Sequence, residues 1–288
     1  MTPTLAVRLA RLAYQSAGGL AKGLPPEVQN PVFLCRKGTQ GFIADLPHDE
    51  AVIAFRGTDP DSIRDWLADL DVDLIPHLDS GGKTHQGFSR ALQYVWADVH
   101  AEIMRREPMA IHLVGHSLGG ALATLCAGRL ASLHHSNLAV ITFGCPRVGT
   151  VRYANWLRQR LDLSIRYVNG IDPVPRVPNF GFQWRLWPPR LRWCGFYRHV
   201  GPMTFCDSNG QLYHNPPGVY VAADRMRQYW RDMKQRRTTL LEHHYIESYV
   251  EAIDFDRMLR RLAANNPPPD EGSRVRRISR GQSDNFRK

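Results

Sequence analysis

The chain lacks several features that define large classes of proteins. It has no apolar run that approaches the roughly 18 residues a membrane-spanning helix needs. Its five cysteines are odd in number and none belongs to a C-x-x-C pair, so we expect neither a disulfide framework nor a zinc site. Internal repeats and the signatures of zinc-finger, RRM or helix-turn-helix modules are also missing. These absences argue against an integral membrane protein and against a nucleic-acid partner.

The charge of the chain is unbalanced. It has 37 Lys and Arg against 27 Asp and Glu, which gives a formal net charge of +10 and an isoelectric point near 9.7. Such an excess favours anionic partners, including an acidic lipid surface, but a solvated basic face explains it equally simply. The charge says nothing about the oligomeric state.

The two ends of the chain differ from its middle. Residues 1–17 carry Arg8 and Arg11 inside what would be the apolar part of a secretory signal, so we interpret them as an amphipathic helix. We therefore expect a cytoplasmic protein, with export by another route left open. Residues 265–288 contain three consecutive prolines and few apolar residues, which predicts a disordered basic tail. Residues 1–264 are expected to form a single domain.

Hydrophobic patterning in the middle of the chain predicts an α/β fold. A hairpin at 31–46 and a buried strand at 51–55 come first, and apolar residues at helical spacing follow at 89–106. Strands and helices then alternate, which is typical of a mostly parallel sheet with helices on both faces. The predicted elements are strands at 111–115, 138–144 and 164–170, helices at 118–133 and 151–161, and a last helix at 244–264.

The segment Gly115-His116-Ser117-Leu118-Gly119 is a G-x-S-x-G motif between a predicted strand and a predicted helix. This context is the one that a nucleophile elbow requires, because the tight turn pushes the serine hydroxyl out of the sheet edge. The backbone N–H of Leu118, at the helix start, can donate to an oxyanion that forms on a substrate carbonyl. The alternative is a glycine-rich turn without chemistry.

Several separated motifs resemble those of one known family, the class 3 lipases, to which the filamentous-fungal triacylglycerol lipases belong. Besides the elbow, they are FRGT at 55–58, SIRDWLADL at 62–70, THQGF at 84–88, TFGCPRVG at 142–149 and NGIDPVPRVP at 169–178. The resemblance covers most of residues 51–178. It implies an α/β-hydrolase fold with a short helical lid, a lipid ester as substrate, and chemistry that needs neither a cofactor nor a metal.

The resemblance also implies roles for residues after the strand at 51–55. Thr58 takes the position of the oxyanion-hole residue, where its backbone N–H and hydroxyl can both serve, although a turn residue in Gly-Thr-Asp-Pro is the alternative. Trp66 takes a position in the lid. Together with Ile63 and Leu67 it would form an apolar inner face, unless this segment is an ordinary surface helix.

The acid is expected after a strand that follows the serine, since the chain order in this fold is serine, carboxylate, histidine. Asp172 fits, because it lies just beyond the strand at 164–170, on the edge where open parallel sheets carry their sites. It would hold the tautomer of the histidine and stabilise the imidazolium. The alternative is an Asp-Pro turn without a catalytic role.

The base must be chosen among four downstream histidines. His199 resembles a family strand position that is not the base, and His214 has no assigned role. Family members often place the base before the last helix in a D-H-x-x-x-x-Y pattern, and His244 followed by Tyr249 has that spacing. Because His243 stands where the pattern has an acid, the choice between His243 and His244 stays open, with His244 preferred.

The residues and the resemblance together predict a serine carboxylic-ester hydrolase that acts on lipids through an acyl-enzyme at Ser117. An esterase for soluble short-chain esters and a catalytically silent lipid-binding module are the alternatives. Residues 180–197 are rich in aromatic side chains interleaved with arginines, which suits peripheral contact with an anionic membrane. Burial of these rings against the core explains the pattern equally well.

Overall fold

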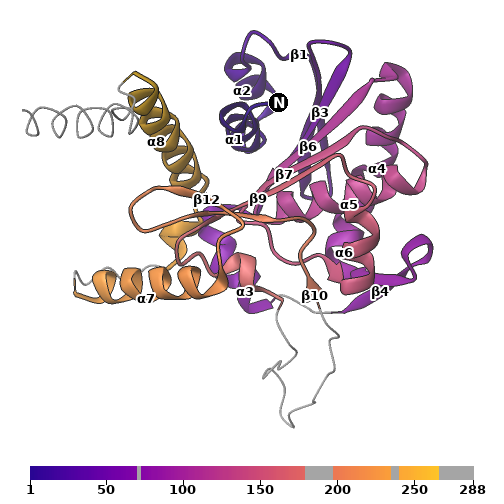
Figure 1. Cartoon of the computed structure of the whole chain (residues 1–288). Helices are drawn as coiled ribbons and strands as arrows, with labels where there is room; N and C mark the ends of the chain where they lie inside the picture. The colour runs from indigo at the N-terminus through magenta and orange to yellow at the C-terminus, as the bar shows by residue number, and fades with distance from the viewer. Residues whose placement is uncertain (70–72, 179–196, 235–239, 266–288) are drawn as a thin grey trace, which may run out of the picture.

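The structure is a computed structural model, and it describes residues 1–69, 73–178, 197–234 and 240–265. A central sheet of eight strands organises the protein (Figure 1). The strand order is β1-β2-β3-β6-β7-β9-β11-β12. The strands are β1 Gln29–Arg36, β2 Thr39–Leu46, β3 Glu50–Phe55, β6 Ala110–His116, β7 Leu138–Phe143, β9 Leu163–Asn169, β11 Met203–Cys206 and β12 Leu212–His214.

The core of the sheet is parallel and its margins are antiparallel. The strands from β3 through β6, β7 and β9 to β11 pair in parallel, whereas β1, β2 and β12 pair antiparallel with their neighbours. The expected hairpin and the alternation of strands and helices are therefore confirmed. All parallel strands end at one edge of the sheet, and the segments that leave this edge carry the candidate site.

Helices cover both faces of the sheet, as expected (Figure 1). They are α1 Pro3–Leu12, α2 Ala17–Gly23, α3 Ile63–Asp69, α4 Gln86–Arg106, α5 Leu118–Ser132, α6 Val151–Arg158, α7 Gly218–Lys234 and α8 Ile246–Asn265. One buried apolar cluster joins α4, α5 and α6 to one face of the sheet, and a second joins α1 and α8 to the other. Within the residues described, no helix is long and apolar enough to cross a membrane.

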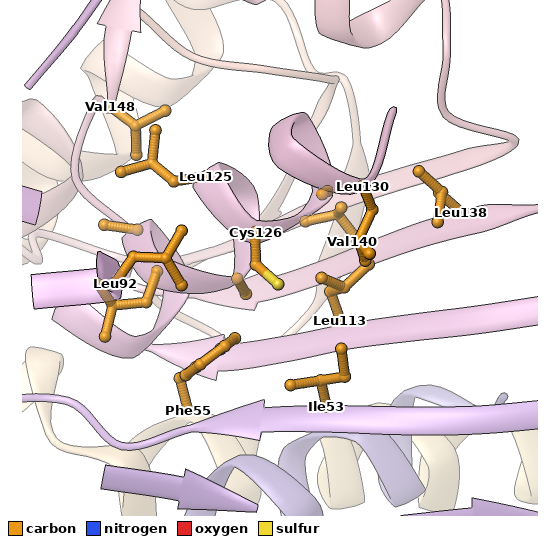
Figure 2. Close-up of a cluster of buried hydrophobic side chains, with 14 of the residues drawn as sticks. Ile53, Phe55, Leu92, Leu113, Leu125, Cys126, Leu130, Leu138, Val140 and Val148 are labelled. Atoms are coloured by element: carbon orange, nitrogen blue, oxygen red, sulfur yellow. The ribbon is translucent and has the colours of Figure 1, made fainter. Parts of the chain in front are cut away.

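The apolar spacing of α4 shows how the sequence determines one layer. Leu92, Val95, Val99 and Ile103 recur at helical intervals and are all buried. Figure 2 shows part of the cluster that they join, in which side chains from α4 and α5 meet those of β3, β6 and β7. Burying a side chain of this size contributes about 1.5–3 kcal/mol, so this layer anchors the strands whose ends carry the site.

Two features were not expected from the sequence. The first is a small second sheet, in the order β10-β8-β5-β4, whose strands have only two to four residues each. They are β4 Leu74–His77, β5 Gly82–His85, β8 Gly149–Thr150 and β10 Tyr197–Arg198. The second is α7, which projects from the rest of the molecule at the lower left of Figure 1.

Candidate active site

A sharp turn between β6 and α5 presents Ser117. Its backbone has φ 56° and ψ −128°, a sparsely populated conformation that costs about 1–3 kcal/mol. The turn is possible because glycines flank it: a Cβ on Gly115 would lie 2.2 Å from the backbone of Gly119, and a Cβ on Gly119 would lie 2.1 Å from the carbonyl oxygen of Phe55. The two glycines thus let α5 start directly against the strands, in the geometry expected of the elbow.

The end of β3 lies beside this turn. Because β3 pairs in parallel with β6, with Phe55 opposite Gly115, the residues after both strands leave the sheet together. A Cβ on Gly57 would lie 2.6 Å from the carbonyl oxygen of His116 and 3.1 Å from Cβ of Ser117. Thr58, the residue expected in the oxyanion hole, follows directly. Leu118 is the first residue of α5, where a backbone N–H has no acceptor within the helix.

Asp172 and His244 meet at the same edge of the sheet. Nδ1 of His244 lies 2.9 and 3.0 Å from the two carboxylate oxygens of Asp172, and both side chains are buried. The carboxylate also accepts the backbone N–H of Val174 at 2.8 Å and the hydroxyl of Tyr249 at 2.5 Å. Burial and the neighbouring carboxylate raise the pKa of Tyr249 well above its usual value, so this phenol stays protonated and donates.

A second buried histidine holds the backbone of the first. Nε2 of His116 lies 2.6 Å from the carbonyl oxygen of His244, and its Nδ1 lies 2.7 Å from the hydroxyl of Tyr14. A neutral imidazole with its proton on Nε2 satisfies both contacts, since it donates to the carbonyl and accepts from the phenol. Burial lowers the pKa of His116 well below its usual value, which agrees with a neutral ring. This chain of contacts connects the turn after α1, the elbow and the segment before α8.

Gly144 gives the imidazole room. It has φ +58°, and a Cβ there would lie 2.9 Å from Cε1 and Nδ1 of His244 and 3.0 Å from Oδ2 of Asp172. The backbone after β7 therefore packs directly against the pair formed by the acid and the histidine. A side chain of any size at this position would displace one of the two.

Three buried polar atoms at this edge have no hydrogen-bond partner among the described residues: Oγ of Ser117, Nε2 of His244 and Oγ1 of Thr58. Buried polar atoms are almost always paired, so three such atoms from three segments mark a site prepared for a ligand. The hydrogen bond between Ser117 and His244 that a triad uses is not formed, and such bonds are often long in a protein without substrate. A cavity of about 710 Å³ opens beside Thr58 and His244, and its wall is formed mainly by residues within 11–23 and 244–247, together with Ile63 and His116.

The other predicted residues occupy distinct positions. The ring of His243 contacts α7 instead of Asp172. Its Nε2 lies 3.3 Å from Oδ2 of Asp232, and its Nδ1 lies 3.4 Å from Nε2 of Gln228. His199 contacts the backbone, with its Nε2 2.7 Å from the carbonyl oxygen of Pro175. The structure therefore brings Asp172 together with His244 and not with His243.

The predicted lid segment forms the short helix α3. Ile63 is buried and lines the cavity, and Trp66 is half-buried and stacks on Phe88 with 6.2 Å between ring centroids. Leu67 is also half-buried. The aromatic segment at 180–197 lies outside the described residues, except for Tyr197.

Sequence reasoning missed three residues that shape the site. The sequence indicates no role for Tyr14, His116 or Gly144. Tyr14 contacts His116, His116 contacts the backbone of His244, and Gly144 packs against His244 and Asp172. Gly144 belongs to the TFGCPRVG motif and His116 to the elbow, so those two positions had a signal. Tyr14 had none, because its partner is 102 positions away in the chain.

A strained serine at a turn between strand and helix, a buried pair of histidine and carboxylate, and unpaired buried polar atoms beside them define the general class of α/β serine hydrolases. Comparisons with known proteins narrow this class. Residues 52–182 match the family model "Lipase (class 3)". The chain is 38% identical over 141 residues to a lipase of Rhizomucor miehei. This aligned segment covers 45% of this chain and 38% of the relative.

The chain is also 30% identical over 164 residues to secreted mono- and diacylglycerol lipase 1 of Fusarium solani. This second aligned segment covers 54% of this chain and 47% of the relative. Thus the chain spans less than half the length of these two relatives.

The solved structure of the Rhizomucor miehei triacylglyceride lipase has the same fold. It aligns with a TM-score of 0.58 and 26% identity over 72% of this chain and 80% of that chain. The expected α/β-hydrolase fold is confirmed. Residues 52–182, which these matches share, are thus similar to the class 3 lipase family.

The expectation of a cytoplasmic protein is wrong. Relatives from Fusarium solani, Penicillium camembertii and Malassezia globosa are named as secreted lipases, which contradicts that location. The expectation depended on Arg8 and Arg11, which interrupt an apolar segment. In the structure both are exposed residues of α1, whose other side is buried against the sheet, so their charge belongs to a folded helix of the domain and carries no information on location.

Proposed function

We propose that this protein is a serine carboxylic-ester hydrolase that acts on lipids through an acyl-enzyme at Ser117. The observation that carries the proposal is the buried pair of Asp172 and His244 at the edge of the sheet where the elbow presents an unpaired serine hydroxyl. The names of the relatives support a lipid substrate, since they are mono- and diacylglycerol or triacylglycerol lipases.

The proposed reaction uses each of these atoms. Nε2 of His244 takes the proton of Ser117 Oγ as this oxygen attacks the ester carbonyl carbon, and Asp172 stabilises the imidazolium. The oxyanion accepts hydrogen bonds from the backbone N–H of Leu118 and from Thr58. When the intermediate collapses, the bond to the alkoxy group breaks and the alcohol leaves with the proton from His244. Water then attacks the acyl-enzyme in the same way and releases the fatty acid.

We propose that α3 is the lid of this site. Ile63 lines the cavity beside Thr58, and the half-buried Trp66 and Leu67 give the helix an apolar side turned toward the protein. At a lipid surface these side chains would exchange their protein contacts for lipid contacts, which opens the cavity to an insoluble ester. We further propose peripheral contact with anionic membranes, which the net charge of +10 supports.

Turnover of emulsified and dissolved esters tests the proposal. The protein is assayed on triacylglycerol and phospholipid emulsions and on a monomeric short-chain ester, with Ser117→Ala as the control. We expect hydrolysis of at least one emulsion, with a rate that rises once the substrate exceeds its solubility, and none by the control. Hydrolysis of the dissolved ester alone would favour the soluble esterase, and no hydrolysis of any ester would favour a silent lipid-binding module.

A further inference from the structure

The helix α7 carries most of its large apolar side chains on its outer face. Val219, Met226, Tyr229, Trp230 and Met233 fall on one side of it at helical spacing and are 46–82% exposed. A helix at the surface of a water-soluble domain normally turns such a stripe toward the core. Large apolar side chains gathered on an exposed face indicate a contact surface rather than random placement.

The side of α7 that faces the protein is mixed: Val221 packs with Val168 and Phe205, and charged side chains on the same side make hydrogen bonds. Asp224 is fully buried and accepts hydrogen bonds from the backbone N–H of Ser208 at 3.0 Å and from its hydroxyl at 2.7 Å. The next turns continue in the same way: Nε of Arg225 donates to the carbonyl oxygen of Gly170 at 3.0 Å, and Asp232 contacts His243 at 3.3 Å. Polar contacts and the packing of Val221 therefore hold the helix together, and its apolar stripe stays exposed in the part of the chain that the structure describes.

The exposed charges of α7 all have one sign. Arg227, Arg231 and Lys234 are exposed, whereas both acids of the helix, Asp224 and Asp232, are turned toward the protein. An apolar stripe flanked by cations is the composition of a helix that lies in the interface of an anionic lipid surface. Tryptophan is also enriched at that depth.

The position of α7 links such a surface to the candidate active site. The loop that Arg225 contacts reaches Asp172 two residues later, and the histidine that Asp232 contacts is directly followed by His244. A Cβ on Gly170 would lie 2.2 Å from Oε1 of Gln228, so the helix is packed closely on the loop of the acid. A surface bound by α7 would therefore be held beside the segments that carry the acid and the base.

We propose that the outward face of α7 is a docking surface for an anionic lipid interface. The inference rests on the proposed function for its meaning, since docking would bring the site to its substrate, but the binding itself does not depend on catalysis. The charge pattern disfavours a second copy of the chain as the occupant. Two copies that met through this same face would place Arg227, Arg231 and Lys234 opposite cations of the partner.

Sedimentation with vesicles tests the docking surface. The full chain is used with Ser117→Ala, so that no lipid is hydrolysed, and the vesicles contain phosphatidylcholine with or without phosphatidylglycerol. The variant Met226→Ser/Trp230→Ser removes two side chains of the stripe. Its matched control is Met104→Ser/Met109→Ser, which removes two side chains that are 54% and 67% exposed elsewhere on the molecule.

We expect the α7 variant to bind anionic vesicles at least about tenfold more weakly, because two large apolar contacts with lipid are lost. The control variant should bind like the parent. Arg227→Gln/Lys234→Gln should weaken binding roughly fivefold for each cation removed, and should do so only when phosphatidylglycerol is present. About 1 M salt, where the Debye length is ~3 Å, should abolish this charge effect.

Equal binding by the α7 variant, the control and the parent would overturn the proposal. So would light scattering that finds a dimer of the parent and a monomer of the α7 variant, because the face would then be an interface between chains. If Met226→Ser/Trp230→Ser melts at a lower temperature than the parent, Arg227→Gln/Lys234→Gln replaces it in the test. Vesicle binding equal to that of the parent would then overturn the proposal. Ester turnover by the wild type tests the proposed function separately. The docking proposal and the proposed function can therefore each be refuted without the other.

Discussion

The variant Tyr249→Phe tests whether the acid of the site is held from behind. The phenol donates to Oδ2 of Asp172 at 2.5 Å and accepts the backbone N–H of Asn169 at 3.1 Å. Tyr249 is 1% exposed, so both hydrogen bonds form away from water. The substitution removes one oxygen atom and adds nothing, which makes the loss of these two bonds its main effect.

The structure gives the size of the effect. A hydrogen bond to a charged group contributes about 1.5–3 kcal/mol, and a buried N–H left without an acceptor costs roughly 1–3 kcal/mol. Asp172 keeps Nδ1 of His244 and the N–H of Val174, and the backbone at Asn169 can relax. We therefore expect the free energy of unfolding to fall by about 2–4 kcal/mol. Because Asp172 loses the hydrogen bond from Tyr249, it should orient His244 less well, and kcat should fall roughly tenfold to hundredfold. This corresponds to an increase of about 1.4–2.7 kcal/mol in the activation free energy.

Chemical denaturation and steady-state hydrolysis of a monomeric ester measure both quantities. Tyr167→Phe is the matched control, because Tyr167 is also buried and its ring stacks on Phe143, but among the described residues its hydroxyl makes no hydrogen bond to Asp172. We expect the control to keep its kcat and to lose less than about 1 kcal/mol of stability. If kcat of Tyr249→Phe stays equal to that of the control, the phenol does not position the acid and the reasoning is refuted.

Three other substitutions are expected to separate the parts of the site. Thr58→Ala should lower kcat roughly 10²–10³-fold on a monomeric ester while Thr58→Ser keeps most of it, and equal loss in both would contradict a role for the hydroxyl. Gly144→Ala should lower kcat at least about hundredfold while circular dichroism stays native, because its Cβ displaces His244; an active variant would show that the imidazole has room.

The third substitution, His116→Gln, concerns pH. The pKa of His116 is depressed in the folded protein, so the unfolded chain takes up the proton first as the pH falls below about 6.5, and wild-type stability drops there by up to about 1.4 kcal/mol per pH unit for this group. Unfolding free energies between about pH 5 and 7.5 should fall less steeply in the variant, and equal slopes would mean that His116 is not held neutral.

The fold and the turn that presents Ser117 could be predicted because their signals are local. The motif around Ser117 places glycines where two backbones nearly touch, and the alternation of buried strands and helices determines which edge it faces. Asp172 followed from chain order and from the end of β9. These features depend on residues that are neighbours in sequence or on a periodic pattern that the sequence displays directly.

The remaining features depend on contacts between distant segments. Adjacent histidines differ only in the direction of their side chains, and that direction is set by Asp172, which lies 72 positions before His244. Tyr14, in the turn after α1, contacts His116, which lies 102 positions further along the chain. The strands of the small sheet are too short to show a period. Most large apolar residues of α7 have helical spacing but point outward, so the rule that a helix buries its apolar stripe does not place them.

Covalent labelling with an alkyl fluorophosphonate tests the central claim most directly. The intact mass of the wild type should increase by one phosphonyl group, peptide mapping should place that group on Ser117, and Ser117→Ala should remain unlabelled. A label on another residue, or equal labelling of the two proteins, would contradict the claim that the hydroxyl at this elbow is the nucleophile.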